Sequence, residues 1–85
     1  MEHIHYEFSA DGGRIVVVSI DQQANVLLLD SSNYQSYCRG GAYRYHGGWR
    51  KASPVRLSIP HTGQWHIAID LAGNSGTIRS SIQIV

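Results

Sequence analysis

The sequence predicts one all-β domain over residues 1–85, folded as an antiparallel β-sandwich or a small barrel of jelly-roll or Greek-key type. Apolar residues recur with a period of two along most of the chain, which is the period of a β-strand. Turn-forming residues separate these segments at intervals of about 8–12 residues, as is typical of sandwiches and barrels. No internal repeat or linker indicates a second domain. We therefore expect about seven strands and one short helical turn near residues 32–39.

The N-terminal part is expected to form three strands. In the first, apolar Ile4, Tyr6 and Phe8 alternate with polar His3, His5 and Glu7. Asp11-Gly12-Gly13 is a typical turn sequence. Arg14–Ile20 is β-branched and nearly continuous, which favours a central strand covered on both faces. After a polar turn at 21–24, Asn25–Asp30 is expected to be a buried strand.

The period of two breaks between Asp30 and Gly41. Ser31 or Ser32 is suited to cap a short helix, and Gly40-Gly41 is suited to end it. Tyr34, Tyr37 and Cys38 are spaced to share one face of a helical turn. This segment therefore predicts a helix of one or two turns.

The C-terminal half is expected to return to strands. Ala42–His46 alternates, Gly47-Gly48 is expected to form a hairpin or a bulge, and Trp49–Ala52 is a short strand candidate. Ser53-Pro54 marks a boundary or a sheet edge. The remaining expected strands are Val55–Ile59, Gln64–Asp70 and Thr77–Val85.

The apolar positions of these strands give the expected core. A domain of this size buries only about 60–65% of the surface of its unfolded chain, so a large internal cavity would be costly. The side chains predicted to point inward are Ile15, Val17, Val26, Leu28, Val55, Leu57, Ile59, Trp65, Ile67, Ile69, Ile82 and Ile84.

Composition narrows the class of protein. Hydrophobic residues make up 42% and charged residues 15% of the chain, as expected of a globular domain and not of a disordered one. The single cysteine excludes an intrachain disulfide and fits a reducing, cytoplasmic setting. The N-terminal residues do not resemble a signal peptide, and the longest apolar runs are too short to span a bilayer. We expect a cytoplasmic protein without a membrane partner.

The charges are unevenly distributed. No carboxylate lies between Asp30 and Asp70, although five of the seven basic residues do, together with most of the aromatic ones. A basic and aromatic stretch suits anions, bases or sugars. The candidate ligand-binding residues are Arg44, Trp49, Arg50 and Lys51, beside the expected Gly47-Gly48 turn. The competing interpretation places the tyrosines of Tyr43-Arg44-Tyr45 in the core and leaves Arg44 on the solvated face.

Histidine and serine patterns give little support for a metal site or an enzyme. His3 and His5 share a strand face with Glu7, but zinc would need further ligands from other strands. His46, His61 and His66 are scattered in the sequence, so we expect exposed polar positions and predict no metal and no cofactor. Gly-x-Ser-x-Gly and phosphate-loop motifs are both absent from the sequence, so we predict no catalytic residues.

Short segments along the whole chain carry a family resemblance. They are His3-Ile4-His5, Ile15-Val16-Val17-Val18, Asn25-Val26-x-Leu28-x-Asp30, Ser32-Asn33-Tyr34, Tyr37-x-Arg39-Gly40, Tyr45-x-Gly47-Gly48, Pro60-His61-x-Gly63-x-Trp65, Ile69-Asp70-Leu71 and Ile78-Arg79-x-Ser81-Ile82. Through them the chain resembles a family of small bacterial all-β domains of unknown function. Some of these relatives look like fusions to Toll/interleukin-receptor-like (TIR) domains, which implies a sensing or docking role. A weaker likeness, through Gly63-Gln64-Trp65, runs to jelly-roll domains of the Golgi-dynamics and pre-peptidase types.

Three functions follow from this sequence. The first is a non-enzymatic binding or interaction module, a cytoplasmic recognition or sensing domain for a protein, a small molecule or an anion. The second is a nucleic-acid or carbohydrate binder that uses residues 43–51, with nucleic acid the less favoured partner. The third is a self-associating structural protein, because edge strands of a small sandwich favour homo-oligomers.

Overall fold

The structure is a computed structural model that describes residues 3–85. Met1 and Glu2, which begin the N-terminal segment compared above with signal peptides, lie outside the described residues. The described chain forms β1 (Ile4–Ala10), β2 (Ile15–Ile20), β3 (Ala24–Asp30), α1 (Ser31–Arg39), β4 (His46–Arg50), β5 (Val55–Ser58), β6 (Gly63–Asp70) and β7 (Ser80–Ile84).

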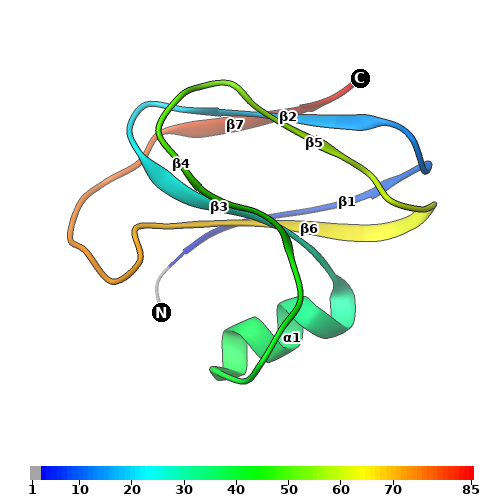
Figure 1. The fold of residues 1–85 in the computed structure, drawn as a ribbon, viewed down its shortest axis with the longest axis horizontal. Helices are drawn as coiled ribbons and strands as arrows, with labels where there is room; N and C mark the ends of the chain where they lie inside the picture. Colours follow the sequence, from blue (N-terminus) through cyan, green and yellow to red (C-terminus); the bar gives the residue numbers. More distant parts are fainter. Residues whose placement is uncertain (1–2) are drawn as a thin grey trace.

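These strands form a sandwich of two antiparallel sheets. One sheet has the strand order β1-β6-β3-β4, and the other has the order β5-β2-β7. Figure 1 shows three layers, with the three-stranded sheet at the top, the four-stranded sheet in the middle and α1 below it. Among the described residues the two sheets stay separate, so the predicted sandwich is confirmed in preference to the barrel.

The main core lies between the two sheets. Of the side chains predicted to point inward, eight are buried there: Val26, Leu28, Val55, Leu57, Ile59, Trp65, Ile67 and Ile69. Ile82 and Ile84 of the edge strand β7 are half-buried against the same core. The apolar side of each alternating strand was therefore predicted correctly.

Strand β2 faces the core with the opposite residues from those predicted. Val16, Val18 and Ile20 are buried, whereas Ile15 and Val17 are half-buried on the outer face. A run of consecutive β-branched residues is equally apolar on both faces, so its pattern does not choose between them. The pairing of β2 with β5 and β7 makes that choice.

A second, smaller core lies between α1 and the outer face of the four-stranded sheet. Leu27 and Leu29 of β3 and Ala68 of β6 are buried there against Tyr37 of α1. Because β3 is covered by the other sheet on one face and by the helix on the other, its sequence is apolar at consecutive positions. The helix thus explains the buried strand that the sequence predicted.

Helix α1 confirms the expected helical segment but begins differently. Asp30 is the N-cap, and its Oδ1 accepts a hydrogen bond from the backbone N–H of Asn33 at 2.8 Å, so neither Ser31 nor Ser32 is the cap. An N-cap carboxylate at the end of β3 lets the chain pass directly from strand to helix. Gly40 ends the helix in the left-handed conformation at φ 76°, as predicted. Cys38 is exposed and does not share the buried face of Tyr37.

Replacing Asp30 by alanine should lower the free energy of unfolding by about 1 kcal/mol at neutral pH, the usual cost of losing an N-cap. The hydrogen bond from the backbone of Asn33 is the main cause that lowers the pKa of Asp30 below its ordinary value of 3.8. Since the ionised form is favoured in the fold, this stabilisation is present above that pH and is lost as the pH falls through the folded pKa.

Urea unfolding at neutral and acidic pH measures both effects. Asp30→Asn is the matched control, because asparagine is a good N-cap that carries no charge. The free energy of unfolding of Asp30→Asn should be close to that of the wild type at neutral pH. It should not show the decrease at acidic pH that the Asp30 carboxylate causes in the wild type. An alanine variant as stable as the wild type at neutral pH would show that the cap contributes nothing.

Strand β4 replaces the predicted hairpin. Residues 41–45 are not in a strand, and β4 runs from His46 through Gly47 and Gly48 to Arg50. Gly47 has a φ of 109°, and a Cβ atom there would overlap the carbonyl oxygen of Val26 on β3. Gly47 therefore allows β4 to approach β3 closely. The pairing of β4 with β3 is continuous through both glycines, so the predicted hairpin or bulge at this point is wrong.

Candidate functional site

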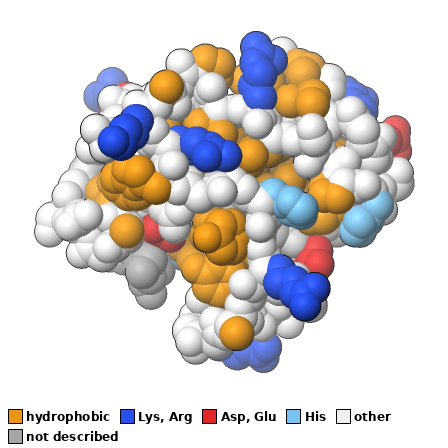
Figure 2. All heavy atoms as spheres, viewed as in Figure 1, with side chains coloured by type: hydrophobic (Ala, Val, Ile, Leu, Met, Phe, Trp, Pro, Cys, Tyr) orange, Lys and Arg blue, Asp and Glu red, His pale blue; other side chains and the backbone are white. Residues whose placement is uncertain are grey.

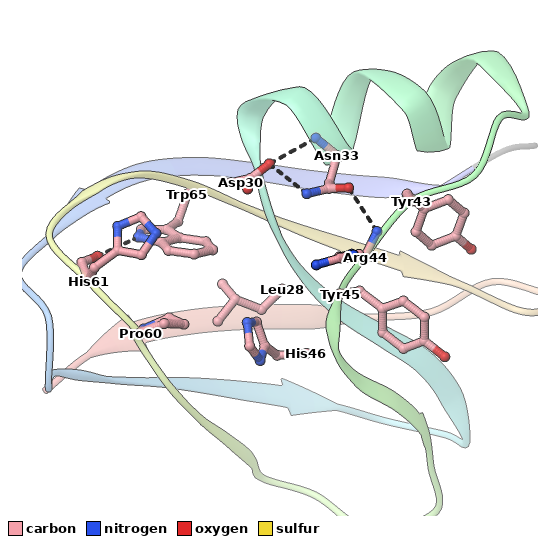
Figure 3. Close-up of a pocket in the computed structure, with 10 residues that line it drawn as sticks. All are labelled: Leu28, Asp30, Asn33, Tyr43, Arg44, Tyr45, His46, Pro60, His61 and Trp65. Carbon is pink, nitrogen blue, oxygen red and sulfur yellow. Dashed lines mark hydrogen bonds between the residues drawn. The ribbon is translucent and has the colours of Figure 1, made fainter.

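A surface hollow of about 580 Å³ lies at one end of the sandwich (Figure 3). We call it the hollow. It lies between the start of α1, the segment that leads into β4, and the turn between β5 and β6. The lining residues are Leu28, Asp30, Asn33, Tyr43, Arg44, Tyr45, His46, Pro60, His61 and Trp65.

The base of the hollow is apolar. Leu28 and Trp65 belong to the main core, and Trp65 is only 3% exposed. The indole Nε1–H of Trp65 donates to the carbonyl oxygen of His61 at 2.9 Å, which ties the β5–β6 turn to the strand beneath it. The rings of His61 and His46 lie 4.9 Å and 6.4 Å from the Trp65 ring, measured between centroids. Two imidazoles thus lie beside one buried indole.

Asn33 holds the segment before β4 in place. Its side-chain N–H donates to Oδ1 of Asp30 at 3.0 Å, and its Oδ1 accepts from the backbone N–H of Arg44 at 2.8 Å. With its backbone held in this way, Arg44 lies at the wall of the hollow, on the side of its segment that faces away from Tyr43 and Tyr45 (Figure 3). The Asp30 carboxylate on this wall is turned to the helix N-terminus and is engaged there by Asn33 and Ser32.

Tyr43 and Tyr45 lie on the other side of the same segment from Arg44 (Figure 3). Tyr43 is half-buried and packs edge-on against Tyr37 at 5.2 Å, whereas Tyr45 is 50% exposed. Burial is the main cause that raises the pKa of Tyr43. The interpretation that placed both tyrosines in the core and Arg44 on the solvated face is correct for Arg44 and in part for Tyr43. It is wrong for Tyr45, because residues 41–45 are not in a strand and Tyr45 is exposed.

The four candidate binding residues do not lie together. Arg44 lines the hollow, but Trp49 and Arg50 lie at the other end of β4, opposite Asn25 and Ala24 of β3. Lys51 follows directly and is exposed. Because β4 runs on as a strand where a turn was expected, the residues after Gly48 are carried away from Arg44.

Sequence reasoning missed His46 and His61. They line the hollow from two different segments, fifteen positions apart in the chain. No spacing rule in a single sequence predicts that the first residue of a strand will lie near a turn far along the chain. Figure 2 shows histidine side chains beside hydrophobic ones on one face, with acidic and basic side chains just below them and further Lys and Arg side chains higher on the same face.

A second group of polar side chains lies on the outer face of the four-stranded sheet, next to α1. His5, Glu7 and His66 offer metal-ligating atoms that all lie within 4.8 Å of one another. Burial is the largest cause that lowers the pKa of His5, followed by the neighbouring imidazoles of His66 and His3. Burial is also the main cause that raises the pKa of the nearby Tyr34 to about 12. We call His5, Glu7 and His66 the outer-face cluster.

Comparison with known proteins places the chain in a family without assigning an activity. No curated protein and no solved structure matches the chain. Within the described residues, α1 is too short and too polar to cross a membrane. The family described as Domain of unknown function (DUF1883) matches residues 1–85. The chain therefore belongs to the DUF1883 family, whose function is unknown, as its sequence resemblance implied.

Proposed function

We propose that this domain is a non-enzymatic recognition module that binds one small anionic ligand in the hollow. The observation that carries the proposal is the convergence of Arg44, His46 and His61 around the buried indole of Trp65. A concave site of about 300–1,000 Å³ with mostly apolar walls and a few converging polar groups is the usual form of a small-molecule site.

Arg44 supplies the charge for this recognition. A guanidinium presents several N–H donors in a fixed plane, which match the two oxygens of a carboxylate or phosphate. Asn33 holds the backbone of Arg44 at 2.8 Å, so part of the cost of ordering this segment is already met before a ligand binds. The rings of His46 and His61 give flat surfaces for a planar part of the same ligand.

The hollow favours a small ligand over a long polyanion. A strand-length track of basic residues would suit nucleic acid, but Arg50 and Lys51 lie at the far end of β4. At about 3.3 Å per residue, five strand residues separate the two ends by roughly 13 Å or more. The chain resembles domains some of which look like fusions to TIR domains. This resemblance supports a role for the domain in sensing such a ligand.

Tryptophan fluorescence can report on the hollow alone. The chain has two tryptophans, and Trp49→Phe leaves Trp65 as the only one. This variant would be titrated at low salt with inorganic phosphate, mononucleotides, acidic oligosaccharides and single-stranded DNA. Arg44→Ala in the same background should weaken binding of the anionic ligand by about 10–100-fold, because it removes a charged hydrogen-bond donor.

The matched control is the double variant Arg50→Ala/Lys51→Ala. It removes more charge than Arg44→Ala but lies outside the hollow, so it should weaken binding less than about threefold, mainly through long-range attraction. A greater loss in the double variant than in Arg44→Ala would place the ligand at the other end of β4. If none of the probes binds at low salt, the proposal of an anion site is wrong.

A further inference from the structure

The outer-face cluster is assembled by the pairing of two strands. In the antiparallel pair of β1 and β6, Glu7 lies opposite His66 and His5 lies opposite Ala68. His5 and Glu7 are two residues apart, so they point to the same face as His66, away from the main core. His66 is 6% exposed, and both β1 residues are exposed. The cluster is thus anchored at one end and open to solvent at the other.

The two imidazoles are held edge to edge. Nε2 of His5 and Nδ1 of His66 are 2.8 Å apart, and the two rings are within 11° of one plane. The ring of Tyr34 from α1 stacks over both, at 4.1 Å from His5 and 4.6 Å from His66 between centroids. Packing by the helix therefore fixes the direction in which both nitrogens point.

The other nitrogen of His66 already has a partner. Its Nε2 lies 2.9 Å from Oγ of Ser31, the first residue of α1. When this Nε2–H donates to the serine, Nδ1 carries the lone pair that faces His5. Metal-bound histidines commonly have such a partner on the second nitrogen, because it orients the ring and fixes its tautomer.

We propose that Nε2 of His5, Nδ1 of His66 and the carboxylate of Glu7 bind one divalent cation of the zinc type. Imidazole and carboxylate ligands suit zinc, and three protein ligands leave a fourth position for water or another ligand. This position faces solvent because His5 and Glu7 are exposed. The site is independent of the hollow, with which it shares no residue.

The distance between the two histidines requires only a small movement, whereas the carboxylate of Glu7, within 4.8 Å of both nitrogens, has to move closer to them. Tetrahedral zinc with nitrogen ligands at about 2.0–2.1 Å places two ligand atoms roughly 3.3 Å apart. The nitrogens of His5 and His66 lie 2.8 Å apart and would separate by about 0.5 Å as zinc replaces the shared hydrogen bond. Glu7 accepts a hydrogen bond from Gln64 on the exposed edge and would exchange it for the metal. Both changes move exposed side chains of the sheet surface.

Zinc binding is tested on the tag-free chain by calorimetric titration and thermal unfolding. Zinc at about 100 times its dissociation constant should raise the melting temperature by roughly 10–20 °C, because it binds the folded chain alone. Co²⁺ should give the visible absorption of a tetrahedral site. His5→Gln and Glu7→Gln should each weaken binding more than tenfold, as expected when one of three ligands is lost. Both positions are exposed, so these variants should fold.

His46→Gln and Cys38→Ser are the controls, since neither residue belongs to the outer-face cluster. Both variants should bind zinc like the wild type. A melting temperature that zinc leaves unchanged would overturn the proposal. So would a His5→Gln variant that binds as tightly as the wild type, or binding that disappears in Cys38→Ser, which would indicate a thiolate ligand.

Discussion

Replacing Trp65 by alanine should lower the free energy of unfolding by about 3–5 kcal/mol, the range found when a large aromatic is removed from a core. Trp65 is 3% exposed in the core between the sheets, where it lies opposite Phe8 on β1 and Asp30 on β3. Its removal also breaks the hydrogen bond that ties its indole to the carbonyl of His61. The loss therefore combines an empty volume with an unpaired carbonyl at the surface turn.

Urea and thermal unfolding measure this effect. In a domain of this size about 3–5 kcal/mol corresponds to a fall of roughly 12 °C or more in melting temperature. Such a loss is a large part of the stability of a small domain, so the variant could also fail to accumulate in folded form. Trp65→Phe keeps most of the aromatic volume, so its free energy of unfolding should fall less than that of the alanine variant. A soluble alanine variant with an unchanged melting temperature would show that Trp65 lies outside the core.

The period of two predicted the sandwich because it reports which side of each strand is buried. This period was sufficient to predict the buried face of β5, where polar and apolar residues alternate. It was also sufficient for β6, where the large aromatic Trp65 indicates which face is buried. It failed for β2, where Ile15-Val16-Val17-Val18 is apolar on both faces. There the burial depends on the register with β5 and β7, which no local pattern contains.

The site was only partly predictable for the same physical reason. The absence of carboxylates between Asp30 and Asp70 pointed to Arg44, since a composition bias can be read along the chain. His66 gains its neighbour His5, sixty-one residues away, through the pairing of β1 with β6. His61 lies in the β5–β6 turn and shares the hollow with His46, fifteen residues away. His5 and Glu7 were placed on one face correctly, but the ligand that completes their group comes from β6.

Gly47→Ala should also be strongly destabilising, by about 2–5 kcal/mol, because it combines a steric overlap with backbone strain. A Cβ atom at this position would overlap the carbonyl oxygen of Val26, which is backbone of the central strand β3 and cannot rotate away. A φ of 109° adds strain of about 1–3 kcal/mol for any residue with a side chain. Relief requires β4 to move away from β3, which breaks hydrogen bonds of the sheet.

Gly48→Ala separates the two causes. Gly48 has a φ of 128°, but a Cβ atom there would meet nothing within 4 Å. This variant should bear the backbone strain without the overlap, so it should be the less destabilised of the pair in urea unfolding. If both variants lose the same free energy of unfolding, β4 can move away from β3 at little energetic cost, and the contact with Val26 is unimportant.

Gly47→Ala should also act on the hollow, because His46 and Arg44 lie directly before this glycine. If β4 moves away from β3, these two side chains leave their places in the hollow, and anion binding should weaken by about tenfold or more even in molecules that remain folded. Gly48→Ala should bind almost normally. Fluorescence titration of the two variants at a temperature where both are folded measures this. Unchanged binding in Gly47→Ala would mean that the ligand does not depend on the position of β4, and the assignment of Arg44 and His46 to its site would be wrong.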